Sequence, residues 1–313
     1  MKGLELSRAY FEECGLPVLK SEFSEILPLL AIGLVGSGSE CFGFDDELST
    51  DHDFEPGFCV FLPDEAVVDR RSAFLLERAY SKLPKTFNGF SKSLVSPAGG
   101  SRHGVIRTAD FYLSRCGSQS GDLSVTDWLS IPEYSLAETV NGEIFYDGYG
   151  EFSEIRGRLS AYPDDIRKKK LAGYLLNMEQ AGQYNYGRCV KRGDNAAAQM
   201  AVFEFVNAFL HVAFLINRKY MPYYKWAFRA FSELPKFSEL REPLEYMLSS
   251  DNGDENAALK SGIIDDIAKR VVLTLKNEGL SSVDGGDLGL YARAVNKSIS
   301  DGELRNMSIF AGV

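Results

Sequence analysis

The sequence predicts an α+β domain followed by an all-helical domain. In the first half of the chain, short apolar runs typical of buried strands alternate with helical segments and with turns rich in glycine and acidic residues. From about residue 153 onward the apolar residues keep helical spacing. We therefore expect one domain at residues 1–152 and a second, helical domain at residues 153–313.

Apolar spacing predicts the elements of the first 82 residues in order. They are a helix at 3–14, a helix at 17–30, a strand at 31–35, a strand at 58–62 and a helix at 63–82. Pro17 suits the first turn of the second helix, and Asp64 and Glu65 are acids in the first turn of the third. Residues 51–54 are expected to lead into the second strand.

Glycines divide the rest of the first domain. Residues 84–103 are rich in Gly, Ser and Lys and predict a loop or a hairpin. A strand at 105–108 and a short helix at 110–116 should follow. Asn141-Gly142 is a strong turn signal, and it precedes a strand-like run at 143–146.

Composition excludes several classes of protein. The net charge of −10 argues against broad adhesion to nucleic acid or to an anionic membrane, although a groove for a short RNA end survives this argument. The cysteines number five and lack CxxC spacing, which favours reduced thiols in a cytoplasm over disulfides or a zinc site. The N-terminus does not resemble a signal peptide, and polar residues interrupt the most apolar segment, 201–216. We expect a cytoplasmic protein without a membrane partner.

The stretch at residues 33–63 combines glycines, hydroxyl groups and carboxylates between two expected strands. Gly36-Ser37-Gly38 begins a dinucleotide motif, but Cys41 stands where its third glycine belongs, and no Walker lysine follows. A strand that ends in Gly36-Ser37 can present backbone N–H groups and a hydroxyl to a polyphosphate. This end of the stretch therefore predicts a phosphate site.

The other end of the stretch predicts a metal site. Asp51 and Asp53 are two residues apart, so in a strand both carboxylates share a face while His52 points away. Two carboxylates together with phosphate oxygens suit Mg²⁺, with Mn²⁺ as the alternative. A short acidic pattern can also do no more than solvate a loop, and the order of strand, Gly-Ser, acids and strand is what favours the metal.

Residues 36–53, GSGSECFGFDDELSTDHD, resemble the signature of the DNA polymerase beta-like nucleotidyltransferase superfamily. That signature is an hG[GS] turn and, about a dozen residues on, a DhD/E strand. More narrowly, the chain resembles a bacterial nucleotidyltransferase-like family of unknown function with a helical second domain. The further matching pieces are HGV (103–105), GEIFYDGYGEF (142–152), YPDD (162–165), GR and GD (187–194) and YMPYYKW (220–226).

The resemblance implies a fold and an activity. The fold would be a small mixed sheet flanked by helices, and the activity would be transfer of a nucleoside monophosphate from a nucleoside triphosphate with release of pyrophosphate. Gly36, Ser37 and Ser39 would bind the nucleotide, and Asp51 and Asp53 would be catalytic ligands of Mg²⁺. The superfamily usually adds a third carboxylate on a neighbouring strand.

Three acids have open roles. Asp46 lies in the acidic turn of the narrower family, where it could bind nucleotide or fix the loop through side-chain to backbone bonds. The strand at 105–108 carries no acid, so Asp110 is a candidate third carboxylate, although it could equally be a helix N-cap. Glu204 could be a general base supplied by the helical domain, or part of a buried polar stripe with Asn207 and His211.

Three further features of the helical domain also have two interpretations. Arg188 could contact nucleotide or form a structural ion pair with Asp194. Lys225, next to Trp226, could hold a phosphate while the ring stacks on a base, or the tryptophan could be core. The basic run at 167–170 is most simply a solvated face, with RNA contact as the alternative.

The leading hypothesis is a Mg²⁺-dependent nucleotidyltransferase with a nucleoside triphosphate bound between its two domains. The acceptor hydroxyl would belong to a small molecule or a protein rather than to RNA, because the chain is acidic. The alternative is a catalytically weak nucleotide-binding or regulatory module, such as an antitoxin-like partner protein. The sequence leaves base preference, acceptor and oligomeric state open.

Overall fold

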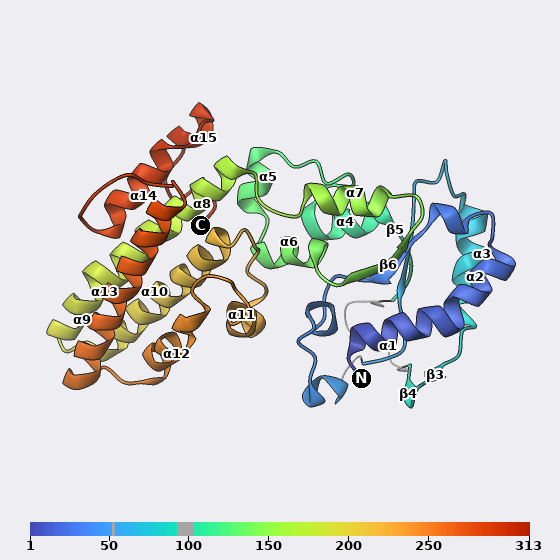
Figure 1. Cartoon of the computed structure of the whole chain (residues 1–313), viewed down its shortest axis with the longest axis horizontal. Coiled ribbons are helices and arrows are strands. Elements are labelled where there is room, and N and C mark those ends of the chain that lie inside the picture. The colour runs from blue at the N-terminus through green and yellow to red at the C-terminus, as the bar shows by residue number, and fades with distance from the viewer. Residues whose placement is uncertain (52–53, 93–102) are drawn as a thin grey trace. The chain divides into compact units, whose positions relative to one another are not determined.

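A computed structural model of the chain (Figure 1) describes residues 1–51, 54–92 and 103–313, and it leaves out the side chains of residues 50 and 51. The contacts divide these residues into two compact units. The first comprises residues 1–123 and 134–160, and the second comprises residues 124–133 and 161–313. The second unit therefore takes a short piece of chain from within the sequence of the first.

The first unit is α+β, as the sequence predicts, with a small mixed sheet flanked by helices. Its strands are β1 (Ala31–Leu34), β2 (Cys59–Leu62), β3 (Thr86–Phe87), β4 (Phe90–Ser91), β5 (Gly104–Arg107) and β6 (Glu143–Asp147). Its α-helices are α1 (Gly3–Tyr10), α2 (Leu16–Glu22), α3 (Arg70–Ser81), α4 (Thr108–Cys116), α6 (Glu133–Val140) and α7 (Glu151–Arg158). Shorter helical turns are η1 (Phe11–Gly15), η2 (Leu27–Leu29), η3 (Glu40–Phe42) and η4 (Glu47–Asp51).

The main sheet has the strand order β5-β2-β1-β6. β2 and β5 are parallel, whereas β1 is antiparallel to both β2 and β6. Val60 and Leu62 face a core with residues of α1, α2 and α3. Phe61, which points to the opposite face as strand geometry requires, packs against Phe111 of α4 and Phe152 of α7. Helices thus cover both faces (Figure 1).

The second unit is helical, as the periodicity after residue 153 predicts. Its α-helices are α5 (Val125–Ser130), α8 (Asp164–Met178), α9 (Gly187–Lys191), α10 (Asn195–Ile216), α11 (Tyr224–Phe231), α12 (Arg241–Ser249), α13 (Asp254–Asn277), α14 (Leu288–Lys297) and α15 (Gly302–Asn306). A π-helix, η5 (Glu179–Tyr186), joins α8 to α9, and a short 3-10 turn, η6 (Ser238–Leu240), precedes α12.

Helix α10 is the most apolar helix of this unit and one of its core elements. Among the described residues, α10 is the one helix whose length and composition would allow it to cross a membrane. However, 67% of its most apolar window is buried inside the structure. A core helix of a soluble protein passes the same test, and the burial of α10 is consistent with such a protein.

Two expected elements begin or end elsewhere. The helix expected at 63–82 begins only at Arg70, because the Asp69 carboxylate accepts a 2.9 Å hydrogen bond from the Ser72 N–H and caps the helix there. Asp64, an acid of its expected first turn, instead closes a separate turn by accepting from the Ala66 N–H at 2.9 Å. The helix expected at 17–30 ends at Glu22.

Candidate functional site

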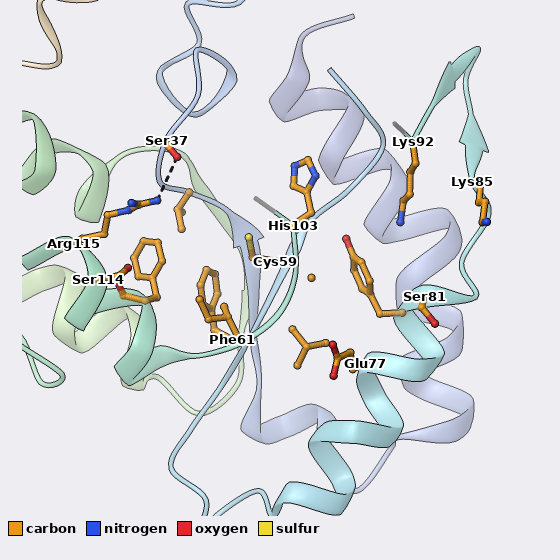
Figure 2. A pocket seen from close by; sticks show the side chains of 16 residues that line it. Ser37, Cys59, Phe61, Glu77, Ser81, Lys85, Lys92, His103, Ser114 and Arg115 are labelled. Atoms are coloured by element: carbon orange, nitrogen blue, oxygen red, sulfur yellow. Dashed lines mark hydrogen bonds between the residues drawn. The ribbon is translucent and has the colours of Figure 1, made fainter. Parts of the chain in front are cut away.

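A pocket of about 660 Å³ opens in the first unit beside the end of β1. Figure 2 shows Ser37 and Arg115 on one side of it and the lysines of the β3–β4 hairpin, Lys85 and Lys92, on the other. The walls come from β2, β5, α3 and α4, with Phe61 and Phe111 among the apolar lining residues. Of the residues predicted to bind nucleotide, Ser37 is the one that lines this pocket among the described residues.

The turn after β1 is built by glycine and is held by an asparagine. Gly36 has a backbone φ of +104°, which residues other than glycine rarely adopt. The Asn141 side chain binds both backbone groups of Gly36, since its Oδ1 accepts from the N–H at 2.8 Å and its Nδ2 donates to the carbonyl at 2.7 Å. The Gly36 N–H is therefore already used by Asn141 in this structure, and phosphate binding by Gly36 and Ser37 stays a prediction.

Ser37 keeps a place in the pocket wall and has a cationic partner. The Arg115 guanidinium, from α4, donates to the Ser37 hydroxyl at 3.3 Å. Glu138 of α6 lies 3.3 Å from Nε of the same arginine and orients it from the other side. A serine hydroxyl and an oriented guanidinium side by side can bind the oxygens of an anion.

Two lysines add positive charge across the pocket. Lys92 Nζ lies 4.7 Å from the ring centroid of Tyr80, and Lys85 lines the pocket from the same hairpin. Burial lowers the pKa of Lys92, and the neighbouring Glu55 carboxylate counteracts part of this effect. Glu77 is the acidic side chain that accompanies these cations among the described lining residues.

A histidine and a cysteine lie between the two groups of cations (Figure 2). His103 Nδ1 is 3.5 Å from Glu55 Oε1, and its ring packs so closely on Gly57 that a Cβ there would approach Nδ1 to 2.4 Å. Burial raises the pKa of the Cys59 thiol to about 12. This cysteine therefore stays protonated and does not act as a nucleophile near neutral pH.

The acidic turn after Ser37 is closed by its own side chains. Asp46 accepts from the backbone N–H groups of Leu48 and Ser49 at 3.1 and 3.2 Å. The Ser39 hydroxyl donates to the Ser49 hydroxyl at 3.3 Å. Of the two roles open to Asp46, the structure shows the loop-fixing one.

The predicted metal ligands fall largely outside the described residues. Asp53 is not described, and Asp51 is described only as the last backbone position of η4. Asp51, expected in the lead-in to the second strand, instead ends a 3-10 helix formed by residues 47–51. Elsewhere among the described residues, no group of three His, Cys, Asp or Glu side chains could hold a metal ion. The Mg²⁺ site remains a prediction.

Neither candidate for the missing acid lies in the pocket wall. Asp110 is exposed at the third position of α4, whose N-cap is Arg107, so it is not the N-cap either. Glu204 is exposed on α10 in the other unit, which contradicts its expected place in a buried stripe. His211, expected in the same stripe, stacks on Tyr174 with ring centroids 4.2 Å apart.

The two basic candidates of the helical unit are exposed and have local partners. Arg188 donates to the Tyr184 hydroxyl and lies over its ring, while Asp194 caps α10 by accepting from the Ala197 N–H at 3.0 Å. Arg188 and Asp194 thus have separate partners and do not form the expected ion pair with each other. Lys225 Nζ lies 4.9 Å from the ring centroid of Trp226.

Four basic side chains of the pocket are not predicted by the sequence. They are Lys85, Lys92, His103 and Arg115. The lysine-rich composition of 84–103 and the HGV motif were the available signals, but neither showed that these residues line one pocket with Ser37. That arrangement depends on β5 pairing with β2 and on α4 packing against the sheet.

Comparison with known proteins gives a family match. Residues 128–227 match a family described as a domain of unknown function, DUF4037. The matched residues run from α5 into α11, and the residues that line the pocket all precede them. No curated protein matches the chain.

Proposed function

We propose that the chain is a nucleotidyltransferase that moves a nucleoside monophosphate from a nucleoside triphosphate to a hydroxyl acceptor. The triphosphate would bind in the pocket beside Ser37. One observation carries this proposal: Lys85, Lys92 and Arg115 line the same pocket as that serine in a chain whose net charge is −10. Such a concentration of cations in a concave site favours a polyanionic ligand.

The chemistry would depend on positioning and on charge neutralisation. The acceptor hydroxyl oxygen attacks the α-phosphorus and gives up its proton to water, the bond from that phosphorus to the bridging oxygen breaks, and pyrophosphate leaves with the electron pair. Arg115 and Ser37 would hold non-bridging oxygens, while Lys85 and Lys92 would neutralise the charge that builds on pyrophosphate. Mg²⁺, if held by Asp51 and Asp53, would supply further charge neutralisation.

A second candidate function is a nucleotide-binding module with weak catalysis or none. The absence of an acid from β5 and the use of the Gly36 N–H by Asn141 favour it. In either case we place the protein in the cytoplasm, since its cysteines Cys14, Cys41, Cys59, Cys116 and Cys189 are free thiols.

Nucleotide binding and pyrophosphate release separate the two functions. We would incubate the protein with each labelled nucleoside triphosphate, Mg²⁺ and pools of hydroxyl acceptors, next to an Asp51→Asn/Asp53→Asn variant. The enzyme proposal expects pyrophosphate release by the wild type and none by the variant. Tight binding without release with every pool rejects the enzyme and retains the binding module. Absence of nucleotide binding rejects both.

Arg115→Met tests the pocket itself. It removes the guanidinium that binds Ser37, so nucleotide affinity should fall about tenfold or more, as the loss of a hydrogen bond to a charged group predicts. The matched control is Arg70→Met, which removes an exposed arginine paired with Glu65 at the start of α3. Equal affinities of the two variants would show that the nucleotide binds elsewhere.

A further inference from the structure

The strand order places His103 at the same end of the sheet as Ser37. Gly33, near the end of β1, pairs with Cys59 at the start of β2, and Cys59 pairs with Gly104 at the start of β5. Because β1 is antiparallel to β2 and β5 is parallel to it, the chain that follows β1 and the chain that precedes β5 share one end of the sheet. Ser37 and His103 accordingly line one pocket (Figure 2).

A carboxylate and a glycine hold the imidazole of His103 in place. The Oε1 atom of Glu55 lies 3.5 Å from Nδ1, and the side chains of His103 and Glu55 are 9% and 23% exposed. The ring also packs on Gly57, where a Cβ would lie 2.4 Å from Nδ1. A carboxylate beside Nδ1 favours the tautomer that carries its proton there, and the lone pair of that tautomer is on Nε2.

The proposed reaction needs a group that accepts a proton, because the acceptor hydroxyl must lose one. None of the residues of β5 is acidic, and Asp110 is not among the described residues that line the pocket. His103 directly precedes β5, so it stands at the strand that lacks the acid. Histidine is the side chain that most often accepts a proton in such reactions, and a carboxylate commonly orients it.

Three other titratable groups of the pocket wall are less suited to this role. Burial raises the pKa of the Cys59 thiol to about 12 and raises the pKa of the Tyr80 hydroxyl well above its usual range. Both groups therefore stay protonated near neutral pH. Glu77, an exposed carboxylate of α3, is the rival base that an experiment has to exclude.

We propose that His103 is the general base of the nucleotidyl transfer and that Glu55 is its positioning residue. Nε2 takes the proton of the acceptor hydroxyl while the hydroxyl oxygen attacks the α-phosphorus. The bond from that phosphorus to the bridging oxygen breaks, pyrophosphate leaves with the electron pair, and the imidazolium then gives its proton to water. The Glu55 carboxylate stabilises the imidazolium that forms. This inference rests on the proposed function, because a module that only binds nucleotide needs no base.

Pyrophosphate release from a mixture of ATP, GTP, CTP and UTP with Mg²⁺ tests this role, with glycerol and water as the hydroxyl acceptors. His103→Ala should lower kcat about 100-fold or more, as the loss of a general base predicts. Its affinity for the nucleotides, measured by titration calorimetry, should stay at the wild-type value. Imidazole in solution should restore part of the lost rate, whereas pyrazole, which has the same shape and is a far weaker base, should not.

Two variants that retain His103 keep the test available if His103→Ala does not fold. Glu55→Gln should lower kcat about tenfold or more, because the imidazole loses the carboxylate that orients it. Its matched control is Glu65→Gln, which removes an exposed carboxylate paired with Arg70 and should retain the wild-type rate. Gly57→Ala should also lower kcat, because its Cβ displaces the ring.

Several outcomes overturn the role of His103 and leave the nucleotidyl transfer in place. They are a wild-type rate in His103→Ala, and a rate of His103→Ala that pyrazole restores as well as imidazole does. A loss of rate in Glu77→Gln, with the rate retained in His103→Ala and Gly57→Ala, would assign the base to the rival carboxylate. Absence of pyrophosphate release by the wild type rejects the proposed function, and the base with it.

Discussion

At the scale of single residues, the turn that carries Ser37 depends on the pair Asn141-Gly142. Asn141 binds Gly36 through its side chain, and the Gly142 N–H donates to the Cys41 carbonyl at 2.7 Å. Gly142 has φ +64°, and a Cβ there would lie 2.0 Å from the Leu34 carbonyl oxygen. Two adjacent residues thus fix the backbone on both sides of the site.

Gly142→Ala should therefore destabilise the first unit by about 3 kcal/mol, from the left-handed conformation and from the clash together. Gly117→Ala is the control, because Gly117 has φ +73° and a Cβ there would meet nothing within 4 Å. It should cost only about 1 kcal/mol. Urea unfolding measures both values, and equal losses would show that the contact with Leu34 relaxes freely.

The sequence predicts that Asn141 and Gly142 form a turn, but it does not predict their hydrogen bonds to Gly36 and Cys41. Asn141-Gly142 is a local signal, and the strand that it predicts after it is present as β6. The bond from Asn141 to Gly36 joins residues 105 positions apart, and no spacing rule connects them. Arg115 and His103 escape prediction for the same reason, since each reaches the pocket through the tertiary packing of its own element.

At the scale of elements, α8 carries a run of basic residues that are buried rather than solvated. Lys169 is fully buried, with its Nζ donating to Asn296 Oδ1 at 2.9 Å and to the Met307 carbonyl at 2.8 Å. Lys170 donates to the Gly312 carbonyl at 2.7 Å. Helical periodicity predicts that α8 exists, whereas the burial of its basic residues depends on partners more than 120 positions away.

The first turn of α8 should make stability depend on pH in a defined window. A hydrogen bond from Lys168, supported by Arg167, lowers the pKa of Asp164 from 3.8 to about 2. The unfolded chain therefore binds this proton more readily, and stability is lost as pH falls from about 4 to about 2. The loss should stay below about 1 kcal/mol, because the carboxylate is half exposed and screened by water.

Asp164→Asn should flatten this part of the stability curve, measured by urea unfolding between pH 2 and 5 in phosphate-free buffer. Lys168→Gln should flatten it as well, because it removes the main cause of the lowered pKa of Asp164. A slope identical to that of the wild type in both variants would assign the acid sensitivity to other carboxylates.

At the scale of the whole molecule, the two units are interleaved in sequence. The expected boundary between residues 152 and 153 assigns α5 to the first domain, because nothing in the local sequence separates it from its neighbours. The contacts assign residues 124–133 to the helical unit. Trp128 of α5 is 7% exposed and meets the ring of Tyr162 edge-on, with centroids 5.6 Å apart.

Alanine substitutions at two buried positions only eight residues apart should consequently destabilise different units. Trp128→Ala should cost about 3–5 kcal/mol and Leu136→Ala, from the fully buried Leu136 of α6, about 2–5 kcal/mol. Hydrogen exchange should rise in α8 for the first variant and in β1 and β6 for the second, because opening follows cooperative units rather than sequence order. Faster exchange of β1 and β6 in Trp128→Ala, with α8 unchanged, would instead place α5 in the first unit and restore the boundary expected from the sequence.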